Sequence, residues 1–267
     1  MAIPRVLVLT GYGINCDEET AFAFEKAGAL PQIIHVNDLI KNPQLLKSFE
    51  ILSFPGGFSY GDDTGSGNAL ANKIRNNLWE NLLEFIDEKK LVIGICNGFQ
   101  VITNLGLLPG IDKKYGERSV ALAHNNTARY ECRWISLKNF SKKCVFTKGI
   151  DNISLPVAHG EGKFTASQQV LEKLGVKDQI VLKYAKRESL ANGEFPFNPN
   201  GAMLDIAGIC DETGRIFGLM PHPERNILFT QQDNWPLQKE ILKRAGAEIP
   251  EDSSGLKIFK NAVDFFK

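Results

Sequence analysis

The sequence lacks an excess of charge of either sign, because 31 Lys and Arg residues balance 31 Asp and Glu residues among its 267. A broad nucleic-acid surface needs many more basic than acidic side chains, so we expect no nucleic-acid partner. The sequence also lacks an apolar run of membrane-spanning length and an apolar leader before a cleavage site. We therefore expect no membrane partner.

Cysteine is scarce, with five residues that are widely scattered and form no Cys-x-x-Cys pair. Zinc ribbons and dithiol redox sites need such pairs, so we expect no metal site and a reduced, cytoplasmic location. No Gly-x-x-x-x-Gly-Lys-Ser/Thr is present, which excludes a P-loop. Gly11 and Gly13 begin a dinucleotide motif, but Cys16 stands where its third glycine should be, which argues against a Rossmann cofactor site.

Strand and helix signals alternate over the first hundred residues. This alternation indicates a parallel sheet with helices on both faces. Such sheets place ligands at the carboxyl ends of their strands. The predicted strands are 6–9, 32–36, 50–54 and 91–95, and the predicted helices are 18–27 and 69–88.

After Gly110 the strand signals become consecutive and the helix signals thin out. We predict antiparallel strands that extend one edge of the same sheet, within a single domain covering residues 1–267. Segment 254–267 has apolar residues at near-helical spacing and is expected to pack as a closing helix. The predicted strands are 120–124, 131–137, 153–158, 179–184, 205–210 and 216–220, with a helix at 168–174.

The strongest functional signal lies in residues 91–100. An apolar run of strand type ends at Cys96, Gly94 and Gly98 stand two places to either side, and a helix-like segment follows. The pattern predicts a nucleophile elbow, in which both glycines remove a clash beside the nucleophile. The following helix N-terminus would favour the thiolate of Cys96. The alternative is a buried cysteine that packs as a small apolar residue.

A thiolate nucleophile needs a base, and the sequence has only four histidines. His222 is the best candidate because it follows a predicted strand and lies between Pro221 and Pro223, which keep the backbone extended. In an extended chain Glu224 points to the same side as His222 and could orient its ring. The alternative is a surface turn with an incidental histidine and glutamate.

A glycine-rich loop at 54–62 follows the third predicted strand and should therefore rise at the same sheet edge as Cys96. Gly56 and Gly57 allow backbone N–H groups to turn toward a ligand without hindrance. The N–H of Gly57, together with one that follows Cys96, could hold a developing oxyanion. A plain glycine-rich turn is the alternative.

Four motifs stand in the chain in this order: Pro-Gly-Gly57-Phe-Ser-Tyr-Gly-Asp62, Gly-Ile-Cys96-Asn-Gly-Phe-Gln100, Pro-Val-Ala-His159-Gly-Glu-Gly162 and Pro-His222-Pro-Glu224-Arg225. This set resembles the class I (triad) glutamine amidotransferases. More narrowly, it is similar to the small glutaminase subunits of phosphoribosylformylglycinamidine synthases from purine biosynthesis. The resemblance implies a flavodoxin-like, three-layer α/β sandwich whose central, mostly parallel sheet is extended by antiparallel strands.

The resemblance also implies a role for each motif. Cys96 attacks the side-chain amide of glutamine, and His222, held by Glu224, moves the protons. The resulting glutamyl thioester then hydrolyses to glutamate. The implied glutamine-binding residues are Gly56, Gly57, Phe58, Gln100, His159, Gly160 and Glu161.

The resemblance implies partners but no cofactor in this chain. Ammonia would pass to a large synthetase subunit, where ATP and Mg²⁺ are expected and where formylglycinamide ribonucleotide becomes formylglycinamidine ribonucleotide. A small third subunit often bridges the two. Residues 226–253 look like an insertion relative to shorter family members, and Ala202 stands where a serine is expected.

Two alternatives remain open. The first is another cysteine hydrolase on a flavodoxin-like fold, such as a peptidase or deglycase. Those enzymes commonly have a histidine directly after the nucleophile, whereas Asn97 follows Cys96 here. The second is a non-catalytic, amidotransferase-like scaffold, and the intact set of Cys96, His222 and Glu224 argues against it.

Overall fold

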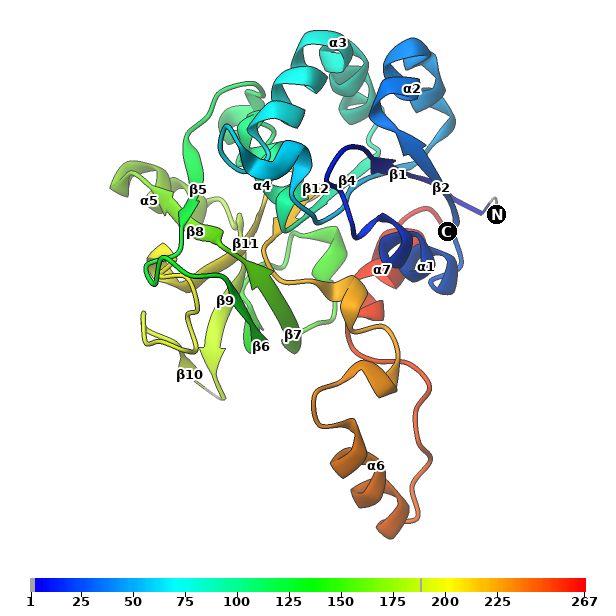
Figure 1. Cartoon of the computed structure of the whole chain (residues 1–267), viewed down its shortest axis with the longest axis vertical. Helices are drawn as coiled ribbons and strands as arrows, with labels where there is room; N and C mark the ends of the chain where they lie inside the picture. Colours follow the sequence, from blue (N-terminus) through cyan, green and yellow to red (C-terminus); the bar gives the residue numbers. More distant parts are fainter. Residues whose placement is uncertain (1–2, 188) are drawn as a thin grey trace.

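A ten-stranded mixed sheet forms the centre of the computed structural model, which describes residues 3–187 and 189–267. Helices cover both of its faces (Figure 1). The strands of this sheet are β1 (Arg5–Thr10), β2 (Leu30–His35), β3 (Ile51–Phe54), β4 (Leu91–Ile95), β6 (Glu131–Asn139), β7 (Asn152–His159), β9 (Ile180–Lys186), β10 (Ser189–Leu190), β11 (Ile206–Cys210) and β12 (Ile216–Leu219).

The order of the strands is β2-β1-β3-β4-β12-β11-β9-β6-β7, and β10 pairs with β9. Pairing is parallel from β2 through β12 and antiparallel from β12 onward. This arrangement confirms the predicted fold class. Strands β3, β4 and β12 are buried at every residue, as a parallel sheet covered on both faces requires.

The helices divide between the two faces of the parallel half. One face is covered by α3 and α4, whereas α1 and α7 pack together on the other. The ring of Phe24 in α1 meets that of Phe259 in α7 edge to face, with centroids 4.9 Å apart. The α-helices are α1 (Asp17–Lys26), α2 (Val36–Lys41), α3 (Asn68–Asp87), α4 (Asn97–Asn104), α5 (Gln168–Val176), α6 (Trp235–Arg244) and α7 (Leu256–Asp264).

Short 3₁₀ turns connect many of these elements. The turn η6 follows β12 closely and, as described below, bears one of the predicted site residues. The 3₁₀ turns are η1 (Pro43–Ser48), η2 (Ser59–Asp62), η3 (Ile111–Lys113), η4 (Val145–Thr147), η5 (Met203–Asp205), η6 (Pro223–Arg225) and η7 (Phe229–Gln231).

One predicted strand, 120–124, lies in a different sheet from the one expected. Strand β5 (Val120–His124) does not extend the main sheet but pairs with β8 (Glu161–Ala166) in a separate two-stranded antiparallel sheet. Only Val120 of β5 is buried, so this strand is not covered on both faces as β3 and β4 are. Strand β8 was not expected at all, because its sequence is short and polar.

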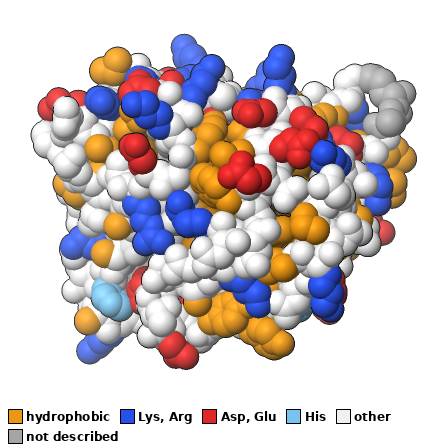
Figure 2. Space-filling model, turned by 90° about the horizontal axis from the view of Figure 1, so that it is seen from above, with side chains coloured by type: hydrophobic (Ala, Val, Ile, Leu, Met, Phe, Trp, Pro, Cys, Tyr) orange, Lys and Arg blue, Asp and Glu red, His pale blue; other side chains and the backbone are white. Residues whose placement is uncertain are grey.

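The segment between η6 and α7 extends away from the sheet as a long excursion that includes η7 and α6 (Figure 1). No residue of α6 is buried. Helix α7, by contrast, buries six of its nine residues against the body of the protein. No helix in the described part of the chain is both long and apolar enough to cross a membrane. On the face seen in Figure 2, acidic and basic side chains are interspersed.

Candidate active site

The carboxyl ends of three adjacent parallel strands bring the predicted site residues together. Strand β4 lies between β3 and β12, with Gly94 opposite both Phe54 and Gly218. Cys96 directly follows β4, Gly56 follows β3, and His222 lies three residues after β12. Because the strands are parallel, these residues emerge at one edge of the sheet, as the sequence predicts.

Cys96 occupies a strained turn between β4 and α4. Its backbone has φ 50° and ψ −107°, a conformation that residues with a side chain rarely adopt, and its N–H donates to the carbonyl of Leu219 at 2.8 Å. A Cβ atom on Gly94 would lie 2.6 Å from the Gly98 carbonyl oxygen, and one on Gly98 would lie 1.8 Å from the carbonyl oxygen of Phe54. These distances confirm that both glycines are needed for the elbow.

The imidazole of His222 is bonded to the carboxylate of Glu224. Nδ1 of His222 lies 2.6 Å from Oε1 of Glu224, and both side chains are buried. The predicted extended backbone ends at His222, however, because Pro223 begins the 3₁₀ turn η6. The contact between His222 and Glu224 is therefore formed by the 3₁₀ turn and not by an extended strand. The backbone N–H of His222 donates to the carbonyl of Pro156 in β7 at 2.9 Å.

The charges around His222 determine its protonation. Burial by itself would lower the pKa of this imidazole, but the Glu224 carboxylate and the charge of Cys96 outweigh burial and raise the pKa well above its ordinary value. The imidazolium form of His222 is therefore favoured. The ring nitrogen that faces away from Glu224, Nε2, has no hydrogen-bond partner among the described residues, so it is available for proton transfer.

The glycine-rich loop after β3 packs tightly against the loop after β1. Gly57 has φ 149°, and a Cβ atom there would lie 2.6 Å from the Gly13 carbonyl oxygen. The N–H of Phe58 donates to that oxygen at 2.7 Å, so it is not available for a ligand. Asn97 begins α4, and its N–H has no carbonyl within the helix to bind. The N–H groups of Gly57 and Asn97 are thus the candidate oxyanion donors.

The side chain of Gln100 is occupied by protein groups at both ends. Its Nε2 donates to the carbonyl of Glu161, and its Oε1 accepts from Nδ2 of Asn97 at 2.9 Å. The Asn97 amide also accepts from the N–H of Ser59 at 3.1 Å. These hydrogen bonds connect α4 to the start of β8 and to the turn η2. The Gln100 amide therefore positions the backbone of Glu161.

His159 lies at the end of β7 and is almost fully buried. Its Nδ1 is 3.2 Å from Oδ1 of Asn125, and its Nε2 is 3.5 Å from Nδ2 of Asn200. Burial, with a smaller effect from His222, lowers the pKa of His159 to about 3, so the ring is neutral near pH 7. A Cβ atom at Gly162 would lie 2.8 Å from this ring, whereas Gly160 has open space around it.

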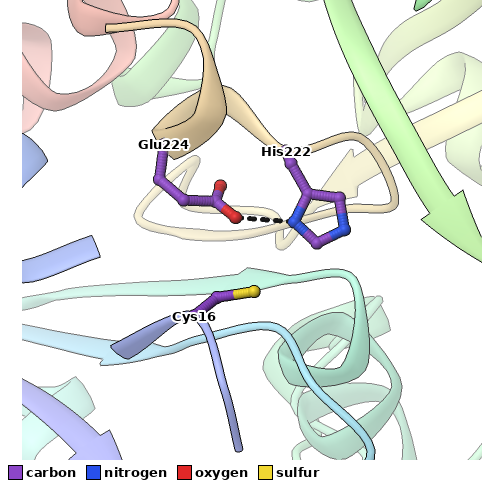
Figure 3. Close-up of side chains that lie close together, drawn as sticks. All are labelled: Cys16, His222 and Glu224. Carbon is purple, nitrogen blue, oxygen red and sulfur yellow. Dashed lines mark hydrogen bonds and ion pairs between the residues drawn. The ribbon is translucent and has the colours of Figure 1, made fainter. Parts of the chain in front are cut away.

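Two side chains at the site are not among the residues selected from the sequence. Figure 3 shows the sulfur of Cys16 facing the bonded pair of His222 and Glu224. One ligand atom from each of these three residues lies within 4.8 Å of the other two. Arg225 donates from Nη2 to Sγ of Cys16 at 3.0 Å. The signal for Cys16 was its position just after the first strand, at the same sheet edge as Cys96.

Thiolate, imidazole and carboxylate are donors that Zn²⁺ accepts, so the residue types of this cluster would suit a metal ion. The sulfur of Cys16 already accepts from the Arg225 guanidinium, and Nδ1 of His222 already shares a proton with Glu224. A metal ion would have to displace a cation and break the 2.6 Å bond. The arrangement therefore fits proton transfer at His222 better than metal binding.

The chain matches, over residues 3–266, the family described as CobB/CobQ-like glutamine amidotransferase domain. It is 58% identical to phosphoribosylformylglycinamidine synthase subunit PurQ of Methanococcus maripaludis, over 99% of this chain and 98% of that protein. The subunit PurQ of Dehalococcoides mccartyi is 46% identical, over 98% of each chain.

A solved structure is similar to this chain in fold and in sequence. The structure of PurLQS from Thermotoga maritima aligns with all of this chain at a TM-score of 0.71 and 29% identity, and the whole of the matched chain is covered. The elbow at Cys96 and the bonded pair of His222 and Glu224 thus lie in a fold that this complex also contains. The chain belongs to the CobB/CobQ-like glutamine amidotransferases and, within them, to the PurQ subunits of phosphoribosylformylglycinamidine synthase.

Proposed function

We propose that this chain is the glutaminase subunit of a phosphoribosylformylglycinamidine synthase, with Cys96, His222 and Glu224 as its catalytic residues. It hydrolyses glutamine to glutamate and ammonia. The ammonia passes to an ATP-dependent synthetase subunit, which converts formylglycinamide ribonucleotide into formylglycinamidine ribonucleotide. The observation that supports this most directly is the strained Cys96 beside a histidine whose pKa is raised by a buried carboxylate.

The reaction begins with attack by the Cys96 thiolate on the side-chain carbonyl carbon of glutamine. The C–S bond forms as the carbonyl becomes a tetrahedral oxyanion, which accepts hydrogen bonds from the N–H groups of Gly57 and Asn97. The imidazolium of His222 then gives its Nε2 proton to the amide nitrogen. The C–N bond breaks, ammonia leaves, and a glutamyl thioester remains on Cys96.

Hydrolysis of the thioester reverses the proton movement. Neutral His222 takes a proton from water as the oxygen attacks the thioester carbon. The C–S bond breaks, glutamate leaves, and the thiolate of Cys96 is restored beside the imidazolium. Glu224 holds the ring of His222 in one orientation and stabilises its charged form throughout, without itself accepting the proton.

The glutamine pocket is formed by the loops on either side of Cys96. Gly56, Gly57 and Phe58 supply one wall, and the segment of His159, Gly160 and Glu161 supplies the other through backbone groups. Gln100 supports this second wall by its bond to the Glu161 carbonyl. The ring centroids of Phe58 and Tyr130 lie 6.2 Å apart, and both side chains are exposed.

The chain acts in the cytoplasm together with two protein partners. ATP and Mg²⁺ act on the large synthetase subunit, and a small third subunit bridges it to this chain. Segment 226–253 is an insertion within a single domain that is closed by residues 254–267. All five cysteines are free thiols in the structure, which is compatible with a reducing compartment.

The direct test is an ammonia-release assay with glutamine as substrate, run with and without the synthetase subunits. We expect glutamate and ammonia in equal amounts in the complex. A diazoketone analogue of glutamine should label Cys96 alone, and glutamine should protect it. Labelling of another cysteine, or no glutamate formation by the complex, would contradict the proposal and favour a different hydrolase or a scaffold.

A further inference from the structure

Cys16 lies directly beside the candidate catalytic pair, on the side of His222 that faces away from its free nitrogen. A Cβ atom on Gly56 would be 2.8 Å from Cε1 of His222 and 3.2 Å from Sγ of Cys16. The sulfur and the ring therefore lie against the same backbone surface. The absence of a side chain at Gly56 allows this close packing.

The surroundings of this sulfur are polar. Nη2 of Arg225 donates to it at 3.0 Å, and the sulfur itself lies 3.3 Å from Oδ1 of Asn15. A buried cysteine that acts only as a small apolar residue would lie among carbon atoms. Cys16 also stands at the N-cap of α1, but its side chain makes no capping hydrogen bond. Neither core packing nor helix capping accounts for a thiol at this position.

Arg225 connects Cys16 to the carboxylate of the catalytic pair. Nε of Arg225 lies 3.9 Å from Oε1 of Glu224, the same oxygen that bonds His222. The other oxygen of Glu224, Oε2, has no hydrogen-bond partner among the described residues. The orientation of this carboxylate therefore depends on few contacts. The Arg225 side chain is about one-third exposed, so it needs an anchor to stay over Glu224.

We propose that Cys16 is a positioning residue of the glutaminase: its sulfur anchors Arg225 over Glu224 and packs against the Nδ1 edge of His222, so that the ring stays aimed at Cys96. This inference rests on the proposed glutaminase function. Cys16 touches no reacting atom and acts through Arg225 and His222. Such contacts behind a catalytic group commonly set its orientation within the narrow range that proton transfer needs.

The inference is tested by comparing Cys16→Ala with Cys16→Ser in the complex with the synthetase subunits. Cys16→Ala should lower kcat for glutamine hydrolysis about tenfold or more, the effect of losing one hydrogen bond from a charged donor, and leave KM within about twofold. Cys16→Ser should restore most of kcat, because its hydroxyl oxygen accepts from Arg225. Cys144→Ala removes another buried thiol elsewhere in the fold and is the matched control.

A misfolded variant is distinguished from a mispositioned one by titrating Cys96 with the diazoketone analogue. Cys16→Ala should still bind one label per chain, but more slowly than the wild type. Arg225→Ala should lower kcat similarly, and the double variant should be little worse than either single variant, because both remove one arrangement. Additive losses would contradict the role of Arg225.

The outcomes separate this inference from the function on which it rests. If the wild-type complex forms no glutamate, the proposed function is wrong. If the wild type is active and Cys96→Ala is inactive, but Cys16→Ala keeps the wild-type kcat, the function holds and the positioning role of Cys16 is wrong. A loss in Cys16→Ala that Cys16→Ser does not recover would also contradict it.

Discussion

Nδ1 of His222 lies 2.6 Å from Oε1 of Glu224, and both residues are about 99% buried. A buried ion pair of this kind is costly unless its charges are well placed, so its presence at a sheet edge points to function more than to stability. Nε2 of the same ring has no hydrogen-bond partner among the described residues, which proton transfer at this atom requires. Four predictions follow from this geometry and its surroundings.

Replacement of Cys96 with alanine should abolish glutamine-dependent synthesis by the complex. Synthesis supplied with ammonia should be largely retained, because the nucleophile and the synthetase site lie on different chains. Both rates are measured with the same reconstituted complex, and wild-type protein is the control. If ammonia-dependent synthesis also disappeared, the proposed division of the reaction between two chains would be wrong.

Replacement of His222 with alanine should lower the rate of glutamine hydrolysis at least about 100-fold, the typical contribution of a general acid–base group. His35→Ala is a suitable control, because Nδ1 of His35 accepts from the N–H of Asn37 and merely caps α2. Steady-state glutamate formation measures both variants. An unchanged rate in His222→Ala would show that His222 is not the acid–base group.

Replacement of Gly98 with alanine should destabilise the protein by about 3 kcal/mol, because the added Cβ atom would lie 1.8 Å from the carbonyl oxygen of Phe54. Gly175 in α5 is the matched control, since nothing lies within 4 Å of a Cβ atom there. Gly175→Ala should stabilise the helix by about 0.5 kcal/mol. Urea unfolding measures both, and equal effects would contradict the elbow geometry.

His159 should make the protein sensitive to acid. Its pKa is about 3 in the folded chain and ordinarily 6.5, so between these values the unfolded chain binds a proton that the folded chain does not. The free energy of unfolding should therefore fall as the pH drops from about 6.5 to 3. In His159→Gln this decline should be shallower. Urea unfolding at several pH values measures it for both proteins. If the free energy of unfolding fell equally with pH in the wild type and in His159→Gln, His159 would not be the source of the decline.

Much of the site could be predicted because it depends on local chain geometry. The spacing of Gly94, Cys96 and Gly98 predicts an elbow wherever a strand turns sharply into a helix, and the structure contains that turn. The alternation of strands and helices predicts a parallel sheet, in which the loops after β3, β4 and β12 must share one edge. Neither inference requires knowledge of distant contacts.

Other features could not be predicted because they depend on which segments meet in space. The apolar residues of β5 indicate a strand but do not identify its partner, so the pairing with β8 was missed. The contact between Arg225 and Cys16 joins residues 209 positions apart. The low pKa of His159 follows from burial among Asn125 and Asn200, which no local pattern specifies.

The sequence by itself determined the strained turn at Cys96 and the sheet edge on which this residue stands, because steric limits on a few neighbouring residues leave little choice there. The tertiary structure alone decided the pKa shifts of His159 and His222 and the polar surroundings of Cys16. Burial and the approach of distant charges set those properties, and both arise only when the whole chain has packed.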